Sequence, residues 1–110
     1  MIIAERICNF FESNDYYLHP SFSIRQLCEL LSIENTSIVH RVINNNLDTT
    51  FYKLVAKYRI NYSLELLKSG NNWTLDVVAN TSGFKSVNTF KKYFEEYIGL
   101  SPFLYRVNSF

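Results

Sequence analysis

The sequence predicts an all-α fold of about seven helices. Apolar residues recur at helical spacing along most of the 110 residues, whereas the alternating pattern of strands is nearly absent. Serine, threonine or asparagine precedes most of the apolar segments, where its side chain can cap a helix. With 47% hydrophobic and 16% aromatic residues, the chain can build a dense core in one domain or in two small units.

The N-terminal part of the chain holds two predicted helices. Residues 2–11 carry apolar side chains at helical spacing, and Pro20 marks the break that follows. Ser23 and Gln26 form a capping-box motif that begins the second helix. The expected inward residues of the second helix are Ile24, Leu27, Cys28, Leu30 and Leu31.

A short third helix and a long fourth helix follow. Asn35 can cap the third helix, and the polar stretch "NNNLD" ends it because Asn and Asp tolerate left-handed backbone. The fourth helix is expected to begin at Thr49 or Thr50, to run to about Ser69 and to end at Gly70. The expected inward residues of the third helix are Ile38, Val39, Val42 and Ile43.

Three further helices complete the predicted fold. Thr74 can cap the fifth, with Asp76 in its first turn favourable to the helix dipole, and Ser86 can cap the sixth. Ser101 and Pro102 begin the seventh, because proline is well suited to the first helical position.

The chain contains an internal repeat with an offset of 51 residues. From Phe22 and Trp73 onward the two copies align without a gap. Each copy reads as a capped helix, a small residue, a tight turn and a second capped helix, which is a helix-turn-helix arrangement. A helical bundle duplicated for packing alone is the alternative. The paired residues include Ser23 with Thr74, Cys28 with Ala79, Asn35 with Ser86, Val39 with Phe90, Arg41 with Lys92, Ile43 with Phe94, and Asp48 with Gly99.

The second copy, "TLDVVANTSGFKSVNTFKKYFEEYIGLSPFLYR", resembles the signature of the AraC/XylS family of bacterial transcription regulators. "YRINYSLELL", residues 58–67, resembles the linker helix of that family, and "HRVINNNLDTTFYKLV" resembles its first subdomain in a Bacteroidetes-type form. The chain departs from the family at Asp48, where glycine is usual, and at Cys28, where alanine is common. The matching residues in the second copy are Ala79, Gly83, Phe84, Phe90, Phe94, Gly99, Pro102 and Arg106.

The resemblance implies the organisation and the function of the chain. Residues 1–48 and 70–110 would be two helix-turn-helix subdomains joined by a linker helix at 49–69, in one compact DNA-binding domain. The function implied is a sequence-specific transcription regulator that inserts two recognition helices into adjacent major grooves. Such a regulator recruits or positions RNA polymerase, as an activator, in the bacterial cytoplasm and nucleoid. A sensor or dimerisation region usually precedes the domain. The operator and the effector do not follow from the sequence, and repression stays open.

Exposed positions at the start of the third and sixth helices are the candidates for DNA contact. Arg and Lys suit guanine, Asn suits adenine, and an apolar side chain can touch a thymine methyl. Residues around the helix caps suit phosphates, because helix N-termini bind anions. Arg59 is interpreted as structural. The base-edge candidates are Ser37, His40, Arg41, Val87, Asn88, Lys91 and Lys92. The phosphate candidates are Asn35, Thr36, Lys85, Ser86 and Thr89.

Composition limits the other classes of protein. The net charge of +1 does not by itself indicate nucleic-acid binding, although the middle of the chain is more basic than its ends. The catalytic, metal and phosphate-loop motifs are absent, so no enzyme, metal or cofactor is predicted. No signal peptide or membrane-spanning run is predicted. Cys8 and Cys28 are interpreted as buried free thiols, with a disulfide as the alternative. The second functional hypothesis is a helical protein-interaction domain whose DNA-binding face is lost or weak.

Overall fold

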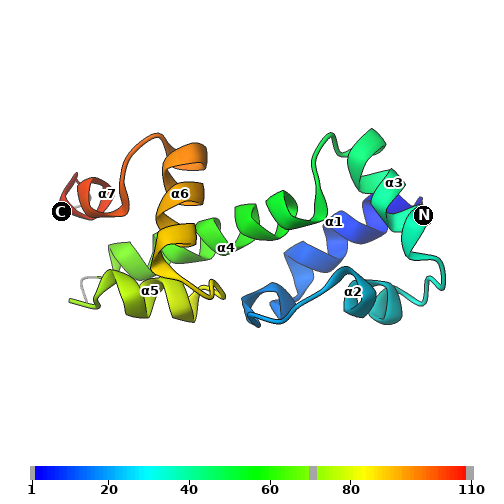
Figure 1. The fold of residues 1–110 in the computed structure, drawn as a ribbon, viewed down its shortest axis with the longest axis horizontal. Coiled ribbons are helices and arrows are strands. Elements are labelled where there is room, and N and C mark those ends of the chain that lie inside the picture. Colours follow the sequence, from blue (N-terminus) through cyan, green and yellow to red (C-terminus); the bar gives the residue numbers. More distant parts are fainter. Residues whose placement is uncertain (1, 70–71, 109–110) are drawn as a thin grey trace. The chain divides into compact units, whose positions relative to one another are not determined.

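The computed structural model describes residues 2–69 and 72–108, and the predicted stop at Gly70 lies outside these ranges. Within them the chain is all-α, as predicted, with seven α-helices and one short 3-10 helix (Figure 1). The helices are α1 (Ile3–Ser13), η1 (Tyr16–Leu18), α2 (Ile24–Leu31), α3 (Thr36–Asn46), α4 (Phe51–Lys68), α5 (Leu75–Thr81), α6 (Val87–Ile98) and α7 (Pro102–Asn108).

The helices form two compact units, Met1–Val55 (unit 1) and Ala56–Phe110 (unit 2). The boundary falls inside α4, so this helix supplies residues to both units. That dual role explains why α4 carries apolar residues on more than one side.

Unit 1 has an aromatic core. Phe22, which precedes α2, lies with its ring 6.1 Å from Phe11 of α1 and 5.7 Å from Phe51 of α4. Both α1 and α2 pack against α3. Arg6 of α1 donates from Nη2 to the carbonyl oxygen of Leu31, one of the acceptors left open at the C-terminus of α2. These contacts fix the angle at which α2 and the turn after it deliver α3.

Two inward predictions in unit 1 are wrong. Leu30 is 41% exposed and Ile38 is 37% exposed, while Val42 is half-buried. In α2 the buried arc runs through Leu27, Cys28 and Leu31, and each helical residue turns by about 100°. Leu30 therefore lies beside that arc and not within it. Ile38 stands in the same relation to Val39 in α3.

Unit 2 has a core built around α6. The ring of Phe90 lies 5.5 Å from that of Phe84 and 5.6 Å from that of Phe94. Ser63 is fully buried on α4, and its hydroxyl donates to the carbonyl oxygen of Ile60 at 2.6 Å, which satisfies the polar group inside the core. The buried cluster comprises Ala56, Ile60, Leu67, Val78, Ala79, Phe84, Phe90 and Phe94.

The helix caps repeat at the offset of 51 residues. Six side chains accept a hydrogen bond from a backbone N–H in the first turn of a helix, at 2.9–3.2 Å. The predicted caps are confirmed, with Thr50 rather than Thr49 at the start of α4. Each cap is worth about 1 kcal/mol to the helix that it begins. The caps are Ser23, Asn35 and Thr50 in the first copy and Thr74, Ser86 and Ser101 in the second.

Among the residues that the structure describes, those with left-handed backbone also fall in pairs 51 positions apart. Ser32 and Gly83 have φ of 58° and 97°, and Asp48 and Gly99 have φ of 52° and 85°. After the first pair, the following residue donates its N–H to a carbonyl oxygen of the preceding helix. Ile33 donates to the Cys28 carbonyl oxygen at 2.9 Å, and Phe84 donates to the Ala79 carbonyl oxygen at 3.0 Å. The two turns therefore have one backbone geometry, although only the second uses glycine. The predicted internal repeat is confirmed.

Candidate nucleic-acid interface

The N-terminal half of α6 presents a polar face on an apolar base. Phe90 and Phe94 are fully buried, so the residues on the opposite side of the helix point outward. Asn88, Lys91 and Lys92 are exposed, as the sequence predicted. One face thus carries an amide and two ammonium groups, which can pair with base edges and with phosphates.

The N-terminus of α6 is organised by Ser86 and Thr89. The Ser86 hydroxyl accepts from the Thr89 N–H at 3.2 Å and lies 3.0 Å from the Thr89 hydroxyl. These two predicted phosphate contacts are therefore part of the cap. The N–H groups of Val87 and Asn88 point along the same end of the helix, where the dipole favours an anion. Lys85 is exposed immediately before the cap and adds a positive charge.

Lys92 is held by a neighbouring ring. Its Nζ lies 5.4 Å from the ring centroid of Tyr93, and Tyr93 stacks between Phe84, at 6.3 Å, and Tyr97, at 6.2 Å. An exposed cation–π contact of this kind is worth about 0.5–1 kcal/mol, which Lys92 gives up if it swings toward a base. This contact was not predicted from the sequence. The sequence signal for this contact is the adjacent pair Lys92 and Tyr93, followed by Tyr97 one helical turn later.

Arg59 and Val87 both contact the core of unit 2. The Arg59 guanidinium carbon lies 5.7 Å from the ring centroid of Phe84, and burial lowers the pKa of Arg59. The structural interpretation of Arg59 is confirmed. Val87 is half-buried and packs against the core cluster, so only part of its side chain is open to a thymine methyl.

The N-terminal half of α3 is the counterpart in unit 1. Val39 and Ile43 are fully buried, and Ser37, His40 and Arg41 are exposed. The Asn35 side-chain oxygen accepts from the Ser37 N–H at 2.9 Å, so Asn35 is engaged as a cap. Half-buried Thr36 begins the helix.

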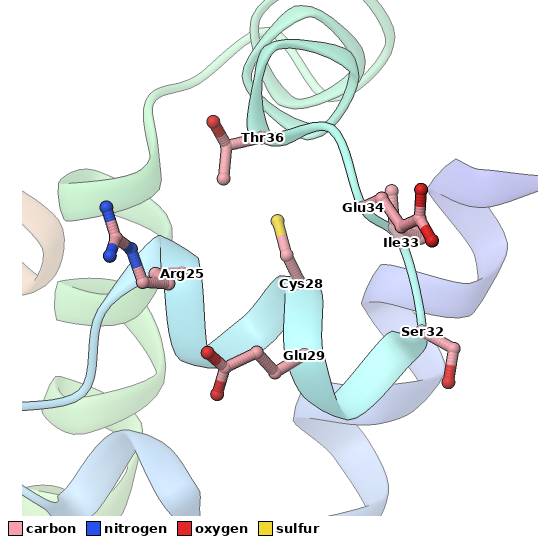
Figure 2. Close-up of a pocket in the computed structure, with 7 residues that line it drawn as sticks. All are labelled: Arg25, Cys28, Glu29, Ser32, Ile33, Glu34 and Thr36. Carbon is pink, nitrogen blue, oxygen red and sulfur yellow. The ribbon is translucent and has the colours of Figure 1, made fainter.

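Beside α3, an open pocket of about 570 Å³ lies over the turn between α2 and α3 (Figure 2). Cys28 points into it from α2 but is only 3% exposed, and burial, followed by the charge of Glu29, raises the pKa of its thiol. Cys28 and Cys8 are both free, so no disulfide joins them. Residues 2–69 and 72–108 contain no group of three or more His, Cys, Asp and Glu that could hold a metal ion. The pocket is lined by Arg25, Cys28, Glu29, Ser32, Ile33, Glu34 and Thr36.

Two capped helix-turn-helix units with exposed polar residues on each second helix define the class of a DNA-binding regulator domain. The sequence family described as a helix-turn-helix domain matches residues 23–108. The chain belongs to this family, in its AraC/XylS type, and the family and fold are those of DNA-binding transcription regulators, not of enzymes.

Known proteins agree with this assignment. The chain is 32% identical over 94 residues to the raffinose operon transcriptional regulatory protein RafR of Pediococcus pentosaceus, over 82% of this chain and 33% of that regulator's length. It superposes on the C-terminal domain of AraT, a response regulator from Geobacillus stearothermophilus, with a TM-score of 0.79, 22% identity and coverage of 98% of this chain and 86% of that one. It also matches the DNA-binding domain of the global transcriptional factor AdpA in complex with a target DNA, with a TM-score of 0.73, 22% identity and coverage of 96% and 89%. None of the helices in the described residues is long and apolar enough to cross a membrane.

Proposed function

We propose that this domain reads a bipartite DNA site with the N-terminal halves of α3 and α6. In this proposal Ser37, His40 and Arg41 face the base edges of one major groove, and Asn88, Lys91 and Lys92 face those of the next. Phosphates contact the N-terminus of each presented helix.

The observation that carries the proposal is the matched pair of presented helices. Each one follows a left-handed turn, begins at a capped N-terminus and leaves polar residues at equivalent positions exposed. A duplication selected for packing alone needs polar residues at outward positions, but it does not require a basic side chain at equivalent ones, as Arg41 and Lys92 are. A helix-turn-helix presents its second helix to the major groove in this way.

The role of residues 49–69 as a linker helix belongs to the same proposal. The 18 residues of α4 give a helix about 27 Å long. Successive major-groove faces on one side of a duplex are ~34 Å apart, which is the same order of length. This helix length is compatible with contact of two grooves by one chain, and DNA bending can account for the difference between the two lengths.

The remaining partners are proposed from the family. RNA polymerase is the expected protein partner, in the bacterial cytoplasm and nucleoid, with activation as the expected outcome. Because the chain spans 33% of the length of RafR, a sensor or dimerisation region elsewhere in a longer protein is part of the proposal.

The test is selection of binding sites from a random duplex library at low salt. The wild-type chain is compared with the double variants Lys91→Ala/Lys92→Ala and His40→Ala/Arg41→Ala. Glu95→Ala/Glu96→Ala, which removes two exposed charges further along α6, is the control. Each lost base contact is expected to cost about 1–3 kcal/mol of discrimination.

Two blocks of enriched sequence about one helical turn apart would support bipartite reading, provided that each double variant relaxes one block. Binding that enriches no sequence and does not weaken with salt would contradict it, because phosphate contacts release counterions. A protein-interaction domain would then be the better hypothesis.

A further inference from the structure

The two presented helices are alike in shape but unlike in charge. Residues 34–41 carry one glutamate and one arginine, whereas the equivalent residues 85–92 carry three lysines and no acid. The same contrast extends over the whole units, since residues 1–55 hold six acids and four bases and residues 56–110 hold four acids and seven bases.

The contrast is sharpest immediately before the caps. Glu34 precedes the Asn35 cap of α3, and Lys85, 51 residues later, precedes the Ser86 cap of α6. Both side chains are exposed, and the turns that carry them share the left-handed geometry of Ser32 and Gly83. The position before the cap therefore carries a carboxylate in unit 1 and an ammonium group in unit 2, on turns of the same backbone geometry.

Figure 2 shows Glu34 on the segment that leads into α3, next to Ile33, and Glu29 on the adjoining helix α2. Glu29 is also exposed, and its counterpart in unit 2 is the uncharged Asn80. Glu29 and Glu34 both line the open pocket beside Thr36, the first residue of α3, and the basic Arg25, whose counterpart in unit 2 is Asp76, lines it as well. Because Arg25 offsets part of the charge of Glu29, the inference depends on Glu34.

We infer that Glu34 weakens phosphate anchoring at the N-terminus of α3, while Lys85 strengthens it at the N-terminus of α6. This inference rests on the proposed DNA-reading function. Its physical basis is that phosphate contacts strengthen binding to any sequence, whereas base contacts discriminate. A carboxylate beside the cap repels every phosphate equally, so unit 1 stays bound only where its base contacts compensate. Unit 2 therefore supplies more of the sequence-independent affinity, and the binding of unit 1 depends more on its base contacts.

The test reverses the two charges in the full 110-residue chain. Affinity for a duplex of arbitrary sequence is measured between about 50 and 200 mM salt for Glu34→Lys and Lys85→Glu. Glu34→Gln and Lys85→Gln are the neutral counterparts. Glu12→Lys, which makes the same change of net charge at an exposed position on α1, is the matched control.

Glu34→Lys is expected to tighten binding to arbitrary sequence about 3- to 10-fold and to steepen the slope of log K against log salt by about 1. Lys85→Glu is expected to weaken binding and to flatten the slope. Each glutamine variant is expected to change the affinity in the same direction as the charge reversal at its position, but by a smaller factor. Glu12→Lys should change the affinity by less than about twofold, because it makes the same change of net charge on a helix that carries no candidate DNA contact. On a duplex carrying the selected motif, Glu34→Lys should gain by about the same factor, because a phosphate contact does not depend on the sequence, so the ratio of specific to arbitrary affinity should stay nearly unchanged.

Equal effects of Glu34→Lys and Glu12→Lys would overturn the inference alone, because net charge and not position would then explain the result. An unchanged affinity in Glu34→Lys, with salt-dependent binding by the wild type, would overturn it in the same way. If neither the wild type nor Glu34→Lys binds any duplex in a salt-dependent manner, the proposed function fails and the inference fails with it.

Discussion

Gly99 offers a prediction whose magnitude depends on the backbone alone. This residue ends α6 with φ of 85°, and a Cβ built there meets no atom within 4 Å beyond its two chain neighbours. Gly99→Ala therefore introduces no clash, and its cost is that of holding alanine in left-handed backbone, about 1–2 kcal/mol. Alanine also lowers the conformational entropy of the unfolded chain, which offsets about 0.4–1 kcal/mol of this cost. The net expected loss in free energy of unfolding is about 1 kcal/mol, or about 4 °C in Tm for a domain of this size.

Urea unfolding followed by circular dichroism measures this loss, with Gly99→Asn as the companion variant. Asparagine tolerates left-handed backbone, so Gly99→Asn should lose roughly half as much as Gly99→Ala. In the first copy, Asp48 at φ of 52° already accommodates a side chain at the equivalent position, so Asp48→Gly should change stability by less than about 0.5 kcal/mol. A Gly99→Ala loss above about 3 kcal/mol would refute the reasoning, because it would require a steric contact. Equal losses for alanine and asparagine would refute it as well.

Three further predictions concern the Ser82 hydroxyl, the two thiols and the partly exposed phenol of Tyr97. The Ser82 hydroxyl is buried without a hydrogen-bond partner among the described residues, so Ser82→Ala should raise the free energy of unfolding by about 1 kcal/mol; a lower urea midpoint would contradict this. Iodoacetamide at neutral pH should alkylate half-buried Cys8 roughly tenfold or more faster than Cys28, whose burial raises its thiol pKa; equal rates by mass spectrometry would count against it. Burial, then Glu96 and Tyr93, raise the pKa of Tyr97, so the unfolded chain ionises first and stability should fall as the pH rises above about 10. Tyr97→Phe should reduce this fall, and an unchanged pH profile would argue against the assignment.

The features that follow from local chemistry could be predicted from the sequence. A cap needs only an oxygen-bearing side chain and the first turn behind it, and the caps at Ser23, Asn35, Thr74, Ser86 and Ser101 are confirmed. The internal repeat added to this, because a helix-turn-helix pattern that is weak evidence in one copy becomes stronger when it recurs 51 residues later.

The features that depend on packing partners were harder to predict. Periodicity places Leu30 and Ile38 near an apolar face, but the width of the buried arc is set by the neighbouring helices, and both residues are partly exposed. The cation–π contact that holds Lys92 depends on the rotamer of Tyr93, which the stacking of Phe84 and Tyr97 fixes. The bases and phosphates that each candidate meets stay predictions.

Because α4 belongs to both units, a change in its length acts on the phase between the side chains that serve each unit. A loop can absorb an inserted residue, but α4 has no loop where Val55 of unit 1 meets Ala56 of unit 2. One residue inserted there would turn the side chains that serve unit 2 by about 100°, and advance them by about 1.5 Å, relative to those that serve unit 1. Seven residues would restore the phase to within about 20°. Each unit keeps its own part of α4 through such a change, so both cores stay intact and only the phase between the two groups of side chains is altered.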